Sequence, residues 1–244
     1  MKIIFLNAWF GEAGKPFFDF IKEESSKTDV YCFSEIKPQL HLKLEEILKN
    51  FNASYQEVFK IVYLGGVTEG ESLFVKKGIE IGENGKKYIY RVTKNDAGAL
   101  QYAKLKIGLK TLWVGNVHGK ALPGSKFDTP ARLMQSKKII DLFGDKMIPR
   151  IIGGDFNLYP NTKSIKMFEE AGYRNLIKDF NIKNTRNRFA WEQAEKHLNG
   201  SGDYFGKQYF ADYCFVSPEV KVKNFEVPYL EVSDHFPLIL DFEV

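Results

Sequence analysis

Hydrophobic residues in this chain come in short runs that stop abruptly at a polar residue. Residues 2–6 and 29–34 are rich in β-branched and aromatic side chains, which is typical of buried strands. In 16–26 and 40–51 the apolar residues instead recur every three or four positions, which predicts amphipathic helices. The first part of the chain therefore predicts the order strand, helix, strand, helix.

In the middle of the chain the alternation of strands and helices gives way to a series of short apolar runs. Glycine-containing turns, such as those at 64–66 and 83–86, separate apolar runs that are too short for helices. We expect these runs to form an antiparallel meander. They predict strands at 55–64, 71–76, 87–94, 98–107 and 111–117.

The second half returns to alternating helices and strands. Helical spacing predicts helices at 131–143 and 164–171, and Gly172 suits the end of the second helix. The segment 181–210 has no regular pattern and is rich in Asn, Gly and Arg, so we expect a long irregular loop. Apolar runs predict strands at 148–152, 212–217, 220–227 and 238–242.

The composition is that of a globular protein. The chain has 244 residues, 44% hydrophobic and 27% charged, which fits one large domain over 1–244. Cys32 and Cys214 stand in apolar runs, so we expect buried free thiols. The N-terminal apolar run is too short for a signal peptide, and no run is long enough to span a membrane. We expect a cytoplasmic protein, monomeric and without a membrane partner.

The net charge changes this picture only slightly. The formal charge is +4 and the pI is about 8.8, a mild basic bias that favours an anionic partner. No block of lysine and arginine stands out as a nucleic-acid-binding tail.

Candidate chemistry is concentrated in the stretch 148–160. An apolar strand ends there in two glycines, and Asp155 and Asn157 follow with Phe156 between them. If the strand stays extended, the carboxylate and the carboxamide point to the same side. The glycines allow a tight turn or a close approach of a ligand to the backbone. The alternative is an ordinary turn, because Gly-Asp followed by Asn is also common turn chemistry.

Other predicted strands end in the same way. Carboxylates, amides and histidines without a cysteine partner suit a hard cation such as Mg²⁺ or Mn²⁺ and a phosphate ester. Singly, each residue has a structural alternative as a cap, a turn former, a solvated charge or a core histidine. Their joint occurrence favours a site at one edge of a sheet. The strand-end residues are Asn7, Glu35, His118, Asp155, Asn157, Asp212, Asp234 and His235.

These residues stand in motifs that resemble the endonuclease/exonuclease/phosphatase superfamily. The motifs occur in the family's order and span nearly the whole chain. The resemblance implies an α/β fold, a four-layer α/β/β/α sandwich of two packed mixed β-sheets flanked by helices. The matching motifs are FLNAW, CFSEIK, GNVHGK, IIGGDFNLYP, ADYCFVS and VSDHFPLIL.

The resemblance also implies roles for the metal ligands. Glu35 would be the principal ligand of a Mg²⁺ or Mn²⁺ ion, assisted by Asn7 and Asp234.

The remaining motif residues would serve the phosphate. Asp155 would orient or deprotonate the attacking water, and Asn157 would hold a phosphate oxygen. His235 would contact the scissile phosphate, with Asp212 or Asp234 orienting its ring. His118 takes the place of a histidine that binds phosphate or protonates the leaving group in one branch of the family.

The run Asn116-Val117-His118 indicates which branch of the superfamily the chain resembles. Abasic-site endonucleases typically carry Asn-x-Tyr there, so the histidine points to the side with secreted deoxyribonucleases, sphingomyelinases, deadenylases and tyrosyl-DNA phosphodiesterases. Inositol-polyphosphate 5-phosphatases usually have a different run near Asp212, which weakens that alternative. The chain departs from the family pattern at Ala211, where an Arg or Lys is common.

Three arginines are candidate substrate contacts. Arg132 begins a predicted helix with an Arg-x-x-Gln pattern, although an exposed helix residue is an equal alternative. Arg186 and Arg188 stand near Phe189 and Trp191, a composition typical of single-strand contacts or of a loop packing its own aromatics. We also expect that Glu71 could pair with His118.

The sequence thus predicts a divalent-metal-dependent phosphodiesterase, first of all a nuclease that acts on DNA or RNA as its nucleic-acid partner. The alternatives are a small-molecule or lipid phosphodiesterase or phosphatase of the same fold and, from another class, an inactive binding module.

Overall fold

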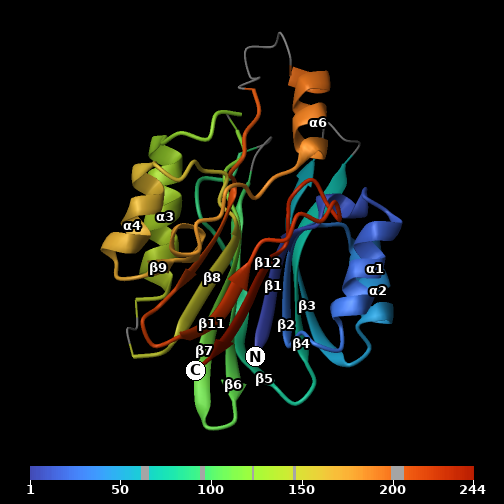
Figure 1. The fold of residues 1–244 in the computed structure, drawn as a ribbon, viewed down its shortest axis with the longest axis vertical. Coiled ribbons are helices and arrows are strands. Elements are labelled where there is room, and N and C mark those ends of the chain that lie inside the picture. Colours follow the sequence, from blue (N-terminus) through green and yellow to red (C-terminus); the bar gives the residue numbers. More distant parts are fainter. Residues whose placement is uncertain (62–65, 94–96, 123, 145–146, 199–205) are drawn as a thin grey trace.

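Two β-sheets packed face to face form the centre of the molecule, and helices cover both outer faces (Figure 1). The structure is a computed structural model that describes residues 1–61, 66–93, 97–122, 124–144, 147–198 and 206–244. Helices α1 and α2 lie on one outer face, and α3 and α4 lie on the other (Figure 1). The predicted four-layer sandwich is confirmed.

The first sheet has six strands in the order β11-β12-β1-β2-β4-β3. It is mixed, because β1 pairs in parallel with β2 while β12, β4, β3 and β11 pair antiparallel with their neighbours. The strands are β1 (Lys2–Asn7), β2 (Val30–Ile36), β3 (Phe51–Ile61), β4 (Val67–Lys76), β11 (Lys221–Glu226) and β12 (Leu238–Glu243).

The second sheet also has six strands, in the order β5-β6-β7-β8-β10-β9. Its one parallel pair is β7 with β8, and the other pairs are antiparallel. The strands are β5 (Glu80–Tyr88), β6 (Ala99–Ile107), β7 (Lys110–His118), β8 (Arg150–Asp155), β9 (Arg174–Asn175) and β10 (Asp212–Val216).

The helices connect these strands. None of the helices in the described part of the chain is long and apolar enough to cross a membrane. They are the 3-10 helix η1 (Trp9–Gly11), α1 (Lys15–Glu24), α2 (Pro38–Ile47), α3 (Pro130–Leu142), α4 (Lys163–Glu170), α5 (Leu176–Asp179) and α6 (Arg188–Leu198).

Strand β1 shows how the sequence pattern builds the layers. Its side chains alternate between two apolar clusters, because successive residues of a strand point to opposite faces. Ile3 and Phe5 belong to the cluster that includes the space between the sheets. Ile4 and Leu6 belong to the cluster under α1 and α2. Cys32 and Cys214 are buried and free, as predicted.

The predicted meander is split between the sheets. Strands β3 and β4 pair in the first sheet, whereas β5, β6 and β7 pair in the second. The turn predicted at 83–86 is wrong, because these residues lie inside β5, which carries a register shift between Ile81 and Asn84. The turn predicted at 64–66 and the end of the strand predicted at 55–64 fall partly outside the described residues.

Two other expectations need correction. The helix predicted at 40–51 ends at Ile47, and Phe51 instead begins β3, where it pairs with Lys76. The segment 181–210 is not wholly irregular, since it contains α6. Asn187 accepts a hydrogen bond from the Phe189 backbone N–H at 3.0 Å, so an asparagine that suggested a loop caps a helix.

Candidate active site

The register of the second sheet brings three predicted residues into one row. His118 pairs with Asp155 across β7 and β8, and Asp155 pairs with Asp212 across β8 and β10. The row lies where β7 and β8 end and the antiparallel β10 begins, so all three side chains meet at one edge of the sheet. The structure therefore confirms that these polar residues, which end or begin their strands, lie next to one another in the fold.

The first sheet contributes two more residues at the same edge. Asn7 ends β1 and pairs with Ser34 of β2. The next residue, Glu35, has a left-handed φ of 53° at a register shift between Phe33 and Ile36. A non-glycine residue rarely adopts this conformation, and such strain is concentrated at functional sites.

Asn7 joins the two sheets. Its Nδ2 donates to Glu35 Oε1 at 2.9 Å and to Asp155 Oδ2 at 3.2 Å. Its Oδ1 accepts from the Trp9 backbone N–H at 3.0 Å, which fixes the orientation of the amide. Asn7 therefore holds the two carboxylates in this structure, and its role as a metal ligand stays a prediction.

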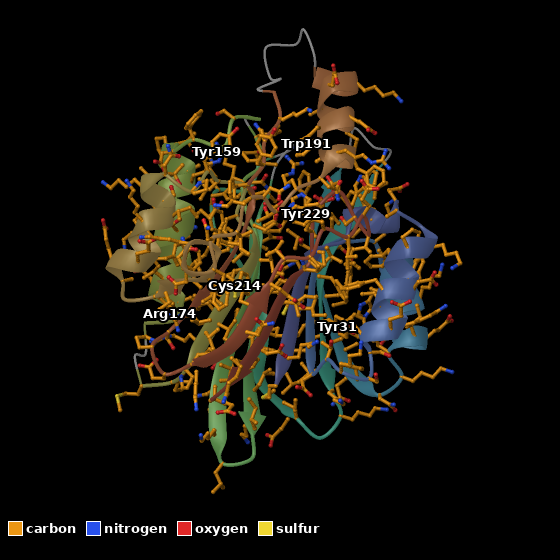
Figure 2. The ribbon with its side chains drawn as sticks, viewed as in Figure 1. Tyr31, Tyr159, Arg174, Trp191, Cys214 and Tyr229 are labelled. Carbon is orange, nitrogen blue, oxygen red and sulfur yellow. The ribbon has the colours of Figure 1, made fainter. Side chains whose placement is uncertain are left out.

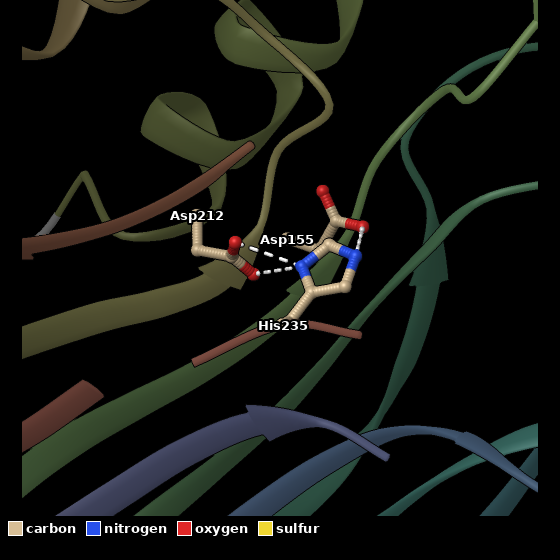
Figure 3. A group of neighbouring side chains, drawn as sticks. All are labelled: Asp155, Asp212 and His235. Carbon is tan, nitrogen blue, oxygen red and sulfur yellow. Dashed lines mark hydrogen bonds and ion pairs between the residues drawn. The ribbon is translucent and has the colours of Figure 1, made fainter. Parts of the chain in front are cut away.

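His235 lies between two carboxylates of the second sheet (Figure 3). Its Nδ1 lies 2.9 Å and 2.8 Å from the two oxygens of Asp212, and its Nε2 lies 3.8 Å from Asp155 Oδ2. Burial alone would lower the pKa of His235, but the charge of Asp212, with those of Asp234 and Asp155, raises it to about 9. Of the two carboxylates considered, Asp212 is the one that orients the ring.

Burial and the nearby positive charges also shift the pKa values of Asp155 and Asp212. Burial would raise the pKa of Asp155, but the positive charges of His235 and then Lys126 hold it below its usual value. Burial raises the pKa of Asp212 despite its contact with His235. At neutral pH the geometry therefore favours a protonated imidazole between an ionised Asp155 and its partner Asp212.

The backbone turns sharply after Asp155. Asn157 has a left-handed φ of 55°, and its N–H donates to Asp155 Oδ1 at 2.8 Å. Of the two alternatives that the sequence left open, the turn is confirmed and the extended continuation is wrong, because β8 ends at Asp155. The carboxylate and the carboxamide nevertheless stay next to each other, since this small turn folds one back toward the other.

His118 is enclosed by carboxylates on both sides. Its Nδ1 lies 2.7 Å from Glu69 Oε1, and its Nε2 lies 3.5 Å from Glu35 Oε1. Burial would lower the pKa of His118, but Glu69 and Glu35 raise it well above its usual value. The suggested partner Glu71 is wrong, because its Oε2 instead accepts from the Gln101 N–H at 2.9 Å.

Asp234 lies beside His235, with its Oδ2 3.9 Å from His235 Nε2, and it has further partners of its own. Its Oδ1 accepts from Ser233 Oγ at 3.2 Å, and its Oδ2 lies 3.7 Å from an Arg186 nitrogen. Arg186 also forms a backbone bridge with His235, which places this arginine beside the histidine. Its contact with substrate stays a prediction.

Lys126 is a site residue that the sequence analysis missed. It is only 4% exposed, and its Nζ donates to Asn157 Oδ1. Burial and then the charge of Arg186 lower the pKa of Lys126 to about 7, while Asp155 and Asp212 act in the opposite direction. Its position in an irregular loop gave no pattern that could have identified it.

Comparison with known proteins identifies the fold. No protein-family model matches the chain, and no curated protein sequence matches it. An endonuclease/exonuclease/phosphatase family protein from Leptotrichia buccalis matches with a TM-score of 0.76 and 16% identity over 100% of both chains. The chain has the endonuclease/exonuclease/phosphatase fold.

Two further structures with this fold illustrate its range. A mannosyl-6-phosphatase from Bacteroides thetaiotaomicron matches with a TM-score of 0.73 and 16% identity over 100% of both chains. The human Nocturnin catalytic domain with a bound sulfate anion matches with a TM-score of 0.71 and 17% identity, over 100% of this chain and 93% of that one. At such identities the likeness concerns the fold alone.

Within the endonuclease/exonuclease/phosphatase fold, two of the predicted substrate contacts, Arg132 and Arg188, have partners within the chain. Arg132 is fully buried, and its guanidinium donates to the carbonyls of Lys120, Ala121 and Phe127. The structure therefore does not support a phosphate contact from Arg132. Arg188 is exposed and makes two hydrogen bonds to Glu231, at 2.6 Å and 2.9 Å.

The residues present fit a hard divalent cation. Glu35 is the accessible carboxylate, with 21% of its side chain exposed, against 3% for Asp155 and 2% for Asp212. Burial would raise the pKa of Glu35, but the hydrogen bond to His118 helps to lower it, so Glu35 is ionised. A cation that keeps several waters needs such an accessible oxygen.

A second possible metal group is Asp155, Asp212 and His235, whose ligand atoms lie within 4.8 Å of one another. Here His235 Nδ1 is already engaged by both Asp212 oxygens, and a protonated ring has no lone pair for a metal. We therefore favour Glu35.

Proposed function

We propose that this chain is a divalent-metal-dependent phosphoric-ester hydrolase and that its first substrate class is a polynucleotide phosphodiester. The observation that carries the proposal is that His235 is held between Asp212 and Asp155, beside the accessible Glu35. This arrangement supplies a cationic donor and a carboxylate acceptor a few ångströms apart, as in-line attack of water on phosphorus requires.

Each residue would have a distinct task. Asp155 would accept a hydrogen bond from the attacking water and orient it. His235, held protonated by Asp212, would donate its Nε2–H to a phosphate oxygen as negative charge develops. Asn157 would donate its amide to a second phosphate oxygen. This division depends on opposite pKa shifts of neighbouring groups.

Glu35 would hold the cation, which is Mg²⁺ or Mn²⁺ in the proposal. When bound, the ion supplies charge neutralisation at the phosphate oxygens. Glu69 and His118 would keep the Glu35 carboxylate in place, because His118 lies between the two acids. His118 has both ring nitrogens next to carboxylates, so we propose this supporting task for it in place of direct phosphate contact.

The polynucleotide substrate is supported by an aromatic rim, which we define as Trp9, Phe10, Phe127, Tyr159, Phe189 and Trp191. Each of these residues follows a site residue by a few positions along the chain. Figure 2 labels Tyr159 and Trp191 near the same end of the molecule. The Trp9 and Phe189 rings stack with centroids 5.8 Å apart, and Arg188 lies 5.0 Å from the centroid of Phe189. Aromatic rings mixed with cations are typical of single-strand binding.

The test is hydrolysis of end-labelled single- and double-stranded DNA and RNA with Mg²⁺, with Mn²⁺ and with EDTA. We expect metal-dependent cleavage with a preference for single strands, and the product ladder separates endo from exo action. Cleavage that persists in EDTA would contradict the metal dependence. Intact polymers under every condition would contradict the nuclease proposal.

A small phosphate ester is the second candidate, and one observation favours it. The exposed rim cation Arg188 is neutralised by Glu231, so the site has few free charges for a long polyanion. In the same assay, bis(4-nitrophenyl) phosphate and 4-nitrophenyl phosphate test this candidate. Turnover of these esters without polymer cleavage would favour a small substrate. No hydrolysis of any substrate would favour an inactive binding module.

A further inference from the structure

We propose that Lys126 is a positioning residue for the reaction, because it fixes which end of the Asn157 carboxamide can donate to the substrate phosphate. The inference rests on the proposed phosphate-ester hydrolysis and adds a residue to it. An ammonium group donates hydrogen bonds and cannot accept them. The Lys126 contact therefore requires an oxygen at that end of the amide and leaves Nδ2 as the donor end.

Burial of Lys126 is the first observation that supports a specific task. Lysine is among the residues least often buried, and a buried ammonium is costly unless it is compensated. Here the ammonium is bonded to a neutral amide, while Arg186 repels it and Asp155 and Asp212 attract it. A methionine would fill the same space without that cost, so packing alone does not account for a lysine at 126.

The loop that carries Lys126 is held on both sides. Before it, the buried Arg132 donates to the carbonyls of Lys120 and Ala121, and Gln208 Nε2 donates to the Gly124 carbonyl at 2.8 Å. At Lys126 itself, the carbonyl accepts from the Tyr159 N–H at 2.9 Å.

Directly after Lys126, Arg132 also donates to the Phe127 carbonyl at 2.8 Å. These hydrogen bonds fix an otherwise irregular loop so that the Lys126 side chain lies in the site.

Asn157 needs such a partner because its other amide contact is weak. Its Nδ2 donates to the Gly119 carbonyl at 3.4 Å, near the limit of a hydrogen bond. The two ends of a carboxamide have nearly the same shape, so the end facing a ligand is decided by hydrogen bonds. With the amide reversed, an oxygen would face the phosphate oxygens and repel them. Lys126 prevents that reversal.

The electrostatics agree with this geometry. Burial, and then the charge of Arg186, lower the pKa of Lys126 to about 7. A neutral amine can also accept a hydrogen bond, so its hold on the Asn157 oxygen weakens as pH rises.

A double-mutant cycle tests the inference on the full chain. Lys126→Met, Asn157→Ala and the double variant are assayed with Mg²⁺ on the best substrate of the wild type. We expect each single variant to lose about 30- to 300-fold in kcat with KM changed less than about 3-fold, the loss typical of one transition-state donor. The double variant should be no slower than Asn157→Ala, because both changes remove one interaction.

The control is Lys163→Met, which removes the same charge from an exposed position on α4 and should retain wild-type kcat. Losses that multiply in the double variant, or wild-type kcat in Lys126→Met, would overturn the inference. If Lys126→Met does not fold, Lys126→Gln takes its place in the cycle. A wild type without any hydrolysis would instead refute the proposed function.

A second measurement tests the positioning without activity. The side-chain NH₂ signals of Asn157 are assigned in a ¹H–¹⁵N NMR spectrum by their loss in Asn157→Ala. In the wild type we expect two dispersed signals with slow hydrogen exchange. In Lys126→Met we expect both signals to shift toward the positions of exposed asparagine amides and to exchange faster with water, whereas unchanged signals would overturn the inference.

Discussion

At the scale of single residues, the candidate site alternates buried charges of opposite sign. Glu69, His118 and Glu35 form one such series, and Asp212, His235 and Asp155 form the other. In each series the carboxylates raise the pKa of the histidine against the effect of burial, and the histidine in turn helps to lower the pKa of Glu35 or Asp155. A change in one carboxylate should therefore affect chemistry more than folding.

Asp155→Asn is the sharpest single change, because it keeps the shape and removes the acceptor charge. We expect kcat to fall by about 10³-fold or more, since an amide cannot orient and activate water as a carboxylate does. The melting temperature should stay within a few degrees of the wild type. Asp141→Asn, at an exposed position of α3, is the matched control and should keep full activity. Comparable kcat values for the two variants would contradict the role of Asp155.

Lys126 predicts a pH dependence of stability. The unfolded chain keeps the lysine proton up to a pKa near 10.5, whereas the folded chain keeps it only to about 7. Between these values the unfolded state binds more protons, so raising the pH stabilises the fold. Lys126→Met lacks this effect and should be the more stable protein at pH 7. Its advantage should shrink on the order of 2–3 kcal/mol by pH 9.5.

Urea unfolding of both proteins at pH 7 and pH 9.5, without metal, measures this difference. Lys163→Met again serves as the charge control, with no pH-dependent gap from the wild type. An advantage of Lys126→Met that is constant with pH would contradict the buried, titrating lysine.

At the scale of elements, the site depends on the close approach of β8 to its neighbours. A methyl group on Gly153 would lie 2.7 Å from the ring of Phe5 in the opposite sheet. Gly154 has a left-handed φ of 121°, and a methyl group there would overlap the Val117 carbonyl oxygen of β7. The glycine pair therefore serves the close approach of other chain segments, whereas the sequence had suggested a tight turn or the approach of a ligand.

Gly154→Ala should destabilise the protein by about 3 kcal/mol or more, because it adds a steric overlap to backbone strain. Gly78→Ala is the matched control: Gly78 has a φ of 102°, but a methyl group there meets nothing within 4 Å. We expect this control to lose only about 1 kcal/mol, the strain contribution. Chemical unfolding measures both, and equal losses would show that the contact with β7 does not matter.

At the scale of the whole molecule, each sheet supplies a different part of the site. The first sheet carries Glu35 and Asn7, and the second carries His118, Asp155 and Asp212. The sheets are tied by Asn7 and by Asn116, whose Nδ2 donates to the Phe33 carbonyl at 2.9 Å. The site therefore exists only when the two sheets are packed against each other.

The small number of cations near the site predicts a weak salt dependence of nucleic-acid binding. Three cations besides the Glu231-bound Arg188 lie on or beside the aromatic rim: Lys37, Arg186 and Lys207. Neutralising up to three phosphates of a single strand gives a slope of about −2 in log K against log salt. Fluorescence anisotropy of a labelled oligonucleotide in EDTA, from 50 to about 200 mM salt, measures it. A slope near zero would mean that the oligonucleotide is not bound through its phosphates.

Much of the fold could be predicted because strand and helix periodicities are local. The strands ending at Asn7, His118 and Asp155 and the helices near 131–143 and 164–171 were found from spacing alone. Helix α6 was missed because its N-terminal cap and Arg188 resemble loop composition. The end of α2 was missed because Phe51 fits the helical stripe, and only pairing with Lys76 makes it a strand residue.

By itself the sequence determined the residue types at the site, because strand ends and motifs are read along the chain. Only the tertiary structure decided their partners: Glu69 over Glu71 for His118, Asp212 over Asp234 for His235, and backbone carbonyls over phosphate for Arg132. It also revealed Lys126. The physical reason is that hydrogen bonds and buried charges act over a few ångströms in space, between segments whose separation along the chain carries no trace of that contact.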